Sequence, residues 1–238
     1  DGQKKFENMV VSGINIKVQG FHFIDSKHSS SDDFSAINII DATKIFIENN
    51  KVTNAHFGIH LANTTYCTVK GNNILGEAVS EQSAGNGIHI WKSSHAFITN
   101  NQIQGHRDGI YFEFVTDSEI RNNKSENNIR YGFRKNGAGV AVMYTHHVRM
   151  EHNVFENNWG TASYAILLKD ITDSWIKNNQ FISNTIGIFM EGCNRIDVKQ
   201  NLFSKNGWAM KVQANCVDNI ISNNNFKSNT FDIATNGT

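Results

Sequence analysis

Ten histidines are the main candidates for chemistry in this chain of 238 residues. His60 and His89 occupy the same place in the repeated strings GIHL and GIHI, and Tyr111 takes that place in GIYF. Met143 is predicted to face outward on a later repeat, in a column that it shares with Trp91 and Glu113. Imidazole suits copper, and soft thioether sulfur selects copper(I). We therefore predict that His60, His89 and Met143 form a copper(I) site. The alternative is a solvated face that carries ordinary histidines.

A second group of polar residues lies around the same strands. The segment at 105–109 brings a histidine, an arginine and an aspartate to one corner, a set suited to a general base and a clamp on a sugar acid. The alternative is a corner stabilised by an Arg–Asp pair. We assign to one partner-binding face the residues Trp91, Tyr111, Glu113, His106, Arg107 and Asp108. No aspartates cluster on adjacent strands of one face, so we predict no catalytic residues and no resident cofactor.

The composition narrows the fold and the partners. Lys+Arg and Asp+Glu both number 22, and this charge balance disfavours a nucleic-acid binder. No run of 18 apolar residues exists, and no basic start leads into an apolar segment, so we expect any signal peptide to be absent from this chain. Proline is absent and asparagine numbers 33, and asparagine disfavours long helices.

Internal repeats indicate the architecture. An apolar-x-x-Asn-x-apolar hexapeptide recurs, and short alternating strands, usually opened by glycine, lie between its copies. The first apolar residue of such a strand precedes the last apolar residue of the next hexapeptide by 15 residues. The return segment, from that residue to the first apolar residue of the following strand, is usually 7 residues. This count of about 22 predicts an all-β, right-handed parallel β-helix of nine to ten coils. The predicted inward column consists of Ile59, Ile88, Ile110, Val140, Ile166 and Ile188.

The asparagines of the hexapeptides fit the bends of such coils. Asparagine tolerates the left-handed backbone that a bend needs, and its amide can bond the equivalent amide one coil away. We predict a scaffold role for Asn50, Asn72, Asn101, Asn123, Asn153, Asn179, Asn201 and Asn224.

The three cysteines give no metal-ligand spacing. Cys67 falls at an inward position and is expected in the core. Cys193 and Cys216 lie nearly one coil apart but offset by one residue in a 22-residue count.

Irregular spacing marks one corner of the coils. Three return segments exceed 7 residues, which predicts loops on one side, either a binding face or merely tolerated insertions. In addition, Phe133 fits both the start of a strand and the end of a hexapeptide. These two places are normally 15 residues apart, so about 15 residues of the repeat are lacking here. We predict that a segment is missing between Gly132 and Phe133.

Several strings outside the repeat consensus resemble the NosD family of β-helix proteins. They are GNGIHIWKSS (85–94), GHRDGIYFEFVTDSEIRNN (105–123), NIRYG (128–132), NGAGVAVMY (136–144), NWGTASYAILLKDITDS (158–174) and NTFDIATNG (229–237). Family members are longer at both ends, so 1–238 resembles a single but truncated β-helix domain. They also usually continue after R-Y-G with a stretch that this chain lacks.

The resemblance implies a non-enzymatic periplasmic protein that helps to assemble the copper centres of nitrous oxide reductase. The implied partners are the ATPase and membrane subunits of an ABC transporter, a copper-carrying lipoprotein chaperone and the reductase itself. Copper(I) would be bound transiently. The alternative from another class is a carbohydrate-active β-helix enzyme, of the lyase or epimerase kind, or a sugar-binding module.

Overall fold

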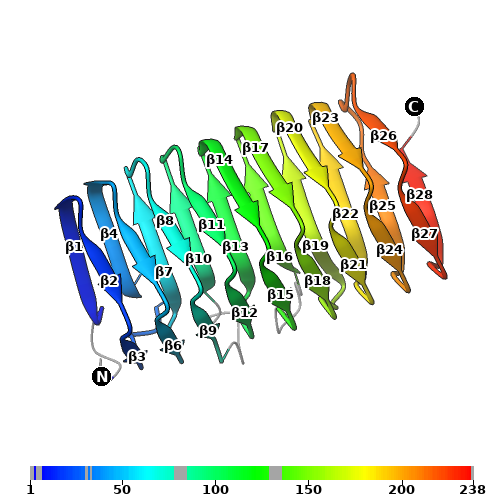
Figure 1. Ribbon diagram of the computed structural model, residues 1–238. Coiled ribbons are helices and arrows are strands. Elements are labelled where there is room, and N and C mark those ends of the chain that lie inside the picture. Colours follow the sequence, from blue (N-terminus) through cyan, green and yellow to red (C-terminus); the bar gives the residue numbers. More distant parts are fainter. Residues whose placement is uncertain are drawn as a thin grey trace.

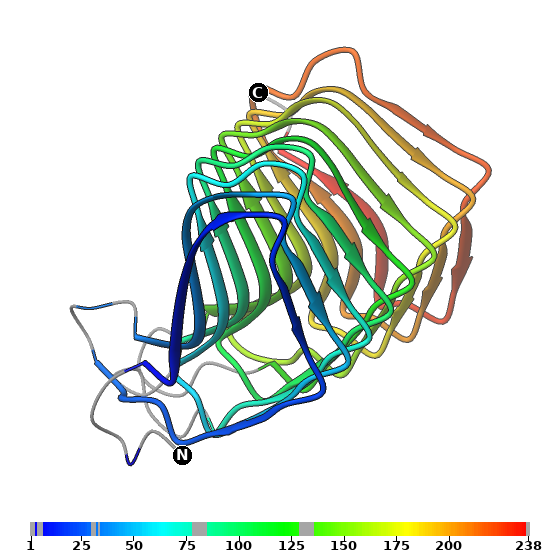
Figure 2. The same cartoon turned by 60° about the vertical axis from the view of Figure 1, so that its left-hand side comes forward.

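The computed structural model describes residues 3, 7–29, 32, 34–77, 85–128 and 136–236. Its 28 strands form three parallel sheets that run the length of the molecule, one strand of each per coil (Figure 1). Figure 2 shows the successive coils nested behind one another along a common axis. The predicted right-handed parallel β-helix of nine to ten coils is confirmed. The described part of the chain holds no helix long and apolar enough to cross a membrane.

The strands of each sheet follow one another at intervals of one coil. The first sheet contains β1 (Met9–Ile14), β4 (Ser35–Thr43), β7 (Phe57–Ala62), β10 (Asn86–Trp91), β13 (Asp108–Glu113), β16 (Asn136–Met143), β19 (Ala162–Lys169), β22 (Ile186–Glu191), β25 (Trp208–Val212) and β28 (Phe231–Thr235). The second contains β2 (Lys17–Gln19), β5 (Phe46–Glu48), β8 (Thr68–Lys70), β11 (Phe97–Thr99), β14 (Thr116–Arg121), β17 (His146–Glu151), β20 (Thr172–Lys177), β23 (Asn194–Lys199) and β26 (Ile220–Ser222). The third contains β3 (His22–Ile24), β6 (Lys51–Thr53), β9 (Asn73–Leu75), β12 (Gln102–Gln104), β15 (Lys124–Glu126), β18 (Val154–Glu156), β21 (Gln180–Ile182), β24 (Leu202–Ser204) and β27 (Asn225–Lys227).

The core is a set of apolar columns inside the coils. The predicted column is confirmed: each of its members is fully buried and lies opposite the next in register. A second column stacks phenylalanine rings, with centroids 5.2, 4.6 and 5.2 Å apart from Phe155 through Phe181 and Phe203 to Phe226. Burying one such side chain contributes roughly 1.5–3 kcal/mol, so stacked coils gain what a single coil cannot.

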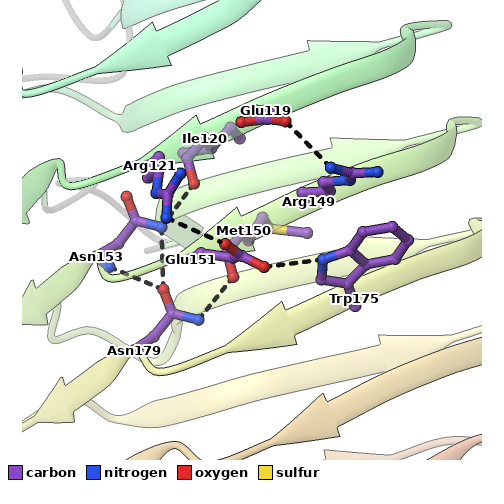
Figure 3. Close-up of polar contacts among 9 residues, drawn as sticks. All are labelled: Glu119, Ile120, Arg121, Arg149, Met150, Glu151, Asn153, Trp175 and Asn179. Atoms are coloured by element: carbon purple, nitrogen blue, oxygen red, sulfur yellow. Dashed lines mark hydrogen bonds and ion pairs between the residues drawn. The ribbon is translucent and has the colours of Figure 1, made fainter.

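The predicted asparagine ladder is present at the bend between the second and third sheets. The Asn72 Oδ1 accepts from both the backbone N–H and the Nδ2 of Asn50, at 2.9 and 3.1 Å. The Asn72 Nδ2 in turn donates to the Asn101 Oδ1 at 2.9 Å and to the Ile47 carbonyl at 3.0 Å. Figure 3 shows the same pattern between Asn153 and Asn179. Each buried amide thereby finds partners on the coils before and after it.

Two features of the bends differ from the sequence-based expectation. The left-handed backbone belongs to the residue before each ladder asparagine, such as Asn49 with φ of 53° and Asn100 with 55°, and not to the ladder asparagine. A second amide ladder, not predicted, lies at the corner between the third and first sheets. It consists of Asn128, Asn158, Asn184, Asn206 and Asn229.

The longer connections also lie at the corner between the third and first sheets. They join β3 to β4, β9 to β10 and β18 to β19, as the spacing predicts, and β15 to β16 as well. The predicted missing segment between Gly132 and Phe133 lies outside the described residues and stays a prediction. The coils on either side are neighbours, since β13 pairs with β16 and β15 with β18.

We predict that Asn72→Ala lowers the free energy of unfolding by about 2–4 kcal/mol, because it leaves buried donors and acceptors on two coils unsatisfied. The matched control is Asn73→Ala, because Asn73 is the next residue in the chain and its side chain is exposed. The control is expected to change stability by less than about 0.5 kcal/mol. Urea unfolding followed by tryptophan fluorescence measures both, and equal losses for the two variants would contradict the ladder's role.

Candidate functional site

His60 and His89 form a stacked pair on the outer face of the first sheet. β7 pairs with β10 so that His60 lies directly opposite His89, and their ring centroids are 4.9 Å apart with planes inclined by only 14°. The Phe57 ring packs edge-on against both imidazoles, at 6.0 and 5.2 Å. Although these positions face away from the core, the two side chains are only 8% and 9% exposed.

The chemical state of His89 follows from this burial. Desolvation, followed by the nearby His60 and Arg107, lowers the pKa of His89 to about 3, so its imidazole is neutral near pH 7. Among the described residues, neither ring nitrogen of His89 has a hydrogen-bond partner. A neutral imidazole with two unengaged nitrogens has the form in which histidine binds metals.

Tyr111 separates this pair from Met143. The Tyr111 ring packs edge-on against His89 with centroids 5.0 Å apart, and its hydroxyl donates to the Met143 Sδ at 3.4 Å. Burial is the first cause that raises the Tyr111 pKa to about 12, which keeps this donor protonated. The sequence placed Met143 in a neighbouring column, and the register confirms it there. The structure therefore brings His60 and His89 together, while Met143 reaches them only through Tyr111.

Among the described residues, no third histidine, cysteine or carboxylate joins His60 and His89 to form a three-ligand metal site. Over residues 7–29, 34–77, 85–128 and 136–236, no group of three such side chains is arranged to hold a metal ion. The donors that the described residues offer are thus the imidazoles of His60 and His89 and, on the far side of Tyr111, the thioether of Met143.

Trp91 and Glu113 occupy the outer column predicted for them. Trp91 lies opposite Glu113, which lies opposite Met143 on the next strand. Both side chains are half-buried, and the Lys92 Nζ lies 4.3 Å from the centroid of the Trp91 ring. Together with the half-buried Tyr111, they flank the histidine pair at the surface.

Of the corner residues assigned to the partner-binding face, His106 and Asp108 are buried, which corrects their place on that face. His106 is 1% exposed, because it lies inside the corner beneath Gly76 and Gly87. Asp108 is 8% exposed, and its two oxygens accept from the Arg107 Nε at 2.9 Å and from the Ala138 N–H at 3.0 Å. Only Arg107 keeps partial exposure. An aspartate so engaged is a poor candidate for a general base.

The sequence did not single out two further histidines at this corner. The His28 ring packs edge-on against His56 with centroids 5.8 Å apart, and His56 stacks on Phe57 at 4.9 Å. Burial, followed by His56 and His28, lowers the pKa of His106 to about 3. These histidines lie outside the alternating strands, so the repeat pattern gave no signal for them.

The outer face of the second sheet carries a hollow of about 350 Å³, lined by Asp117, Ser118, Glu119, His147, Arg149 and Trp175. Figure 3 shows Arg149 engaged with Glu119, and His147 Nδ1 lies 3.1 Å from Asp117 Oδ1. Arg149 Nη1 lies 3.5 Å from Glu119 Oε1, its guanidinium lies 4.4 Å from the centroid of the Trp175 ring, and the Trp175 Nε1 donates to the Glu151 Oε1 at 3.0 Å. The histidine pair, in which both ring nitrogens of His89 lack a hydrogen-bond partner among the described residues, is therefore the stronger candidate site.

Sequence comparisons match this chain to one protein family and, over part of its length, to one named protein. A family model described as "Periplasmic copper-binding protein (NosD)" matches residues 76–238. A protein of Stutzerimonas stutzeri named "Probable ABC transporter binding protein NosD" is 30% identical over 109 residues. That alignment covers 45% of this chain and only 25% of the relative.

Comparison with solved structures gives the fold. The periplasmic alginate epimerase AlgG is 18% identical with a TM-score of 0.60, over 82% of this chain and 50% of that one. The surface adhesin PfbA of Streptococcus pneumoniae is 13% identical with a TM-score of 0.63, over 95% and 72%. An alginate lyase of Paenibacillus sp. str. FPU-7 is 15% identical with a TM-score of 0.60, over 86% and 78%. All three are β-helix proteins by likeness of fold.

The buried His106 predicts a loss of stability in mild acid. The unfolded chain takes up a proton at this residue near pH 6.5, whereas the folded protein resists it until about pH 3. The unfolded state therefore binds more protons in this window, so stability falls as the pH drops from about 6.5 toward 3. We expect His106→Gln to reduce this slope by up to about 1.4 kcal/mol per pH unit. Urea unfolding at pH 7, 6, 5.5 and 5 measures it, and identical slopes in the variant and the parent would contradict the assignment.

Proposed function

The chain belongs to the NosD family of periplasmic copper-binding proteins, and we propose that it helps to assemble the copper centres of nitrous oxide reductase. The family match supports a periplasmic, copper-related accessory role. In this proposal the chain performs no catalysis, and copper(I) is a transient cargo.

The observation that carries the proposal is the buried pair of imidazoles. His89 is neutral near pH 7, its ring nitrogens are unengaged among the described residues, and His60 lies stacked against it. A metal ligand must be free of its proton, and a histidine held neutral by burial meets this condition without a proton being released. We infer that His60 and His89 hold copper(I) between coils.

Met143 supplies a soft donor next to this pair in the proposed site. Its sulfur accepts a hydrogen bond from Tyr111, whose ring packs against His89. A rotation of the Tyr111 side chain would open the way from the thioether to the imidazoles. Thioether sulfur favours copper(I), so Met143 would add selectivity for the reduced metal.

The proposed partners are the ATPase and membrane subunits of an ABC transporter, a copper-carrying lipoprotein chaperone and nitrous oxide reductase. The Stutzerimonas stutzeri relative is itself named a probable ABC transporter binding protein. Tyr111 packs against His89, and Trp91 and Glu113 lie in the neighbouring outer column. These three residues and Arg107 are partly exposed, so a partner that gives or takes copper would contact them.

The alternative of a carbohydrate-active enzyme has weaker support. The likeness to an alginate epimerase and an alginate lyase is a likeness of fold. The Arg107–Asp108 pair suggested a sugar-acid site, but both side chains are engaged within the protein. Arg107 donates to the Asn86 side chain, and Asp108 accepts from the Ala138 N–H. No observation on the described residues favours a reaction on sugar.

The copper proposal is tested by titrating the protein with copper(I) against a competing chelator. Removal of one of the two imidazole ligands by His89→Ala is expected to lower the copper(I) affinity by about tenfold or more, and His60→Ala similarly. Met143→Ala is expected to lower it less, because the thioether is not in contact with the pair.

The control is His22→Ala, which removes an exposed histidine that bonds Thr53 on the third sheet. It should leave the affinity unchanged. Because His89 is buried, the thermal transition of each variant is recorded alongside the titration. Well-folded His60 and His89 variants that bind copper(I) as tightly as the parent would exclude this site.

A further inference from the structure

Cys193 and Cys216 lie on adjacent coils in equivalent positions. Asn194 bridges to Val217, and the Val217 N–H donates to the Cys193 carbonyl at 3.1 Å. The Cys193 N–H points at the Cys216 Sγ, 3.4 Å away. The sequence-based prediction of a one-residue offset is wrong, because this coil has 23 residues where a 22-residue count was applied.

Other coils show how side chains at this position meet. Both cysteines follow a residue of positive φ at the corner between the first and second sheets, as do Thr64 and Ser93. The Thr64 Oγ1 donates to the Ser93 Oγ at 3.1 Å, and the Thr64 N–H donates to the same oxygen at 3.0 Å. Equivalent γ atoms of successive coils are thus in contact at this corner.

The backbone spacing also suits a covalent link. Neighbouring strands lie about 4.8 Å apart, within the roughly 4.4–6.8 Å that separates the Cα atoms of disulfide-bonded cysteines. We propose that Cys193 and Cys216 form a disulfide that joins two successive coils. The family is periplasmic, and disulfides form and persist in that compartment.

The reaction is a thiol–disulfide exchange with an oxidant disulfide. The Cys216 thiolate, having lost its proton, attacks one sulfur of the oxidant and releases the other as a thiol. The Cys193 thiol then loses its proton and attacks the Cys216 sulfur, which forms the Cys193–Cys216 bond and releases the second oxidant thiol. Two electrons and two protons pass to the oxidant in total.

The order of attack follows from exposure. Cys193 is fully buried, whereas Cys216 is partly exposed and can meet the oxidant first. Burial, followed by Cys216, raises the pKa of the Cys193 thiol to about 12, which makes it a poor initial nucleophile. Cys193 thus serves as the resolving residue.

The bond would fasten a coil that is weakly packed. Ile221 and Phe226 are only partly buried, whereas their partners on the preceding coil, Val198 and Phe203, are fully buried. A link from Cys216 to the fully buried Cys193 would tie this coil to the core.

Thiol counting tests the proposal. The full chain, directed to the periplasm of a bacterial host, is unfolded in guanidinium without reductant and alkylated with a maleimide. One reactive thiol, from Cys67, is expected, rising to three after reduction. Peptide mapping should find residues 193 and 216 cross-linked. Purified protein equilibrated with oxidised glutathione should give the same count.

The variants separate the outcomes. Cys67→Ser should leave no reactive thiol before reduction, and Cys216→Ser should leave two under either condition. With the bond formed, the parent should melt several degrees above Cys216→Ser, and reduction should remove the difference. Three free thiols that persist in glutathione disulfide, or a reduced pair that binds copper(I) and resists oxidation, would overturn the proposal.

Discussion

The register between successive coils is the constraint on which the rest of this molecule depends. Every strand is paired in parallel with its equivalents one coil away, and the buried asparagine amides repeat that pairing in their side chains at the bends. Residues more than twenty positions apart in the sequence thereby become direct neighbours, about 4.8 Å apart. Whatever the chain places at equivalent positions of two coils is held in contact by the scaffold.

This register makes a pair of ordinary histidines into a candidate metal site. The stacking of His60 on His89 follows from strand pairing, and Phe57 and Tyr111 shield the rings from water. Shielding keeps His89 neutral, which a solvated histidine would not be in mild acid. The same register brings Cys193 and Cys216 together at another corner, although nothing in the local sequence marks them as a pair.

The repeat pattern was sufficient to predict the columns, because a period of about 22 and a bend asparagine specify which residues stack. It placed His60, His89 and Tyr111 in one column and Met143 in the next, as the structure shows. The pattern carried no information on shielding, so the burial of His106 and of His89 was not foreseen. It also assumed one coil length, and the 23-residue coil before Cys216 therefore hid the cysteine pair.

The copper environment itself is the most direct test of the proposed site. X-ray absorption at the copper edge of the copper(I)-loaded protein, with its cysteines oxidised, reports the ligand atoms. We expect a shell dominated by imidazole nitrogen with at most one sulfur, and loss of the imidazole signal in His89→Ala. A shell dominated by sulfur, or an imidazole signal unchanged in that variant, would contradict a site built on His60 and His89.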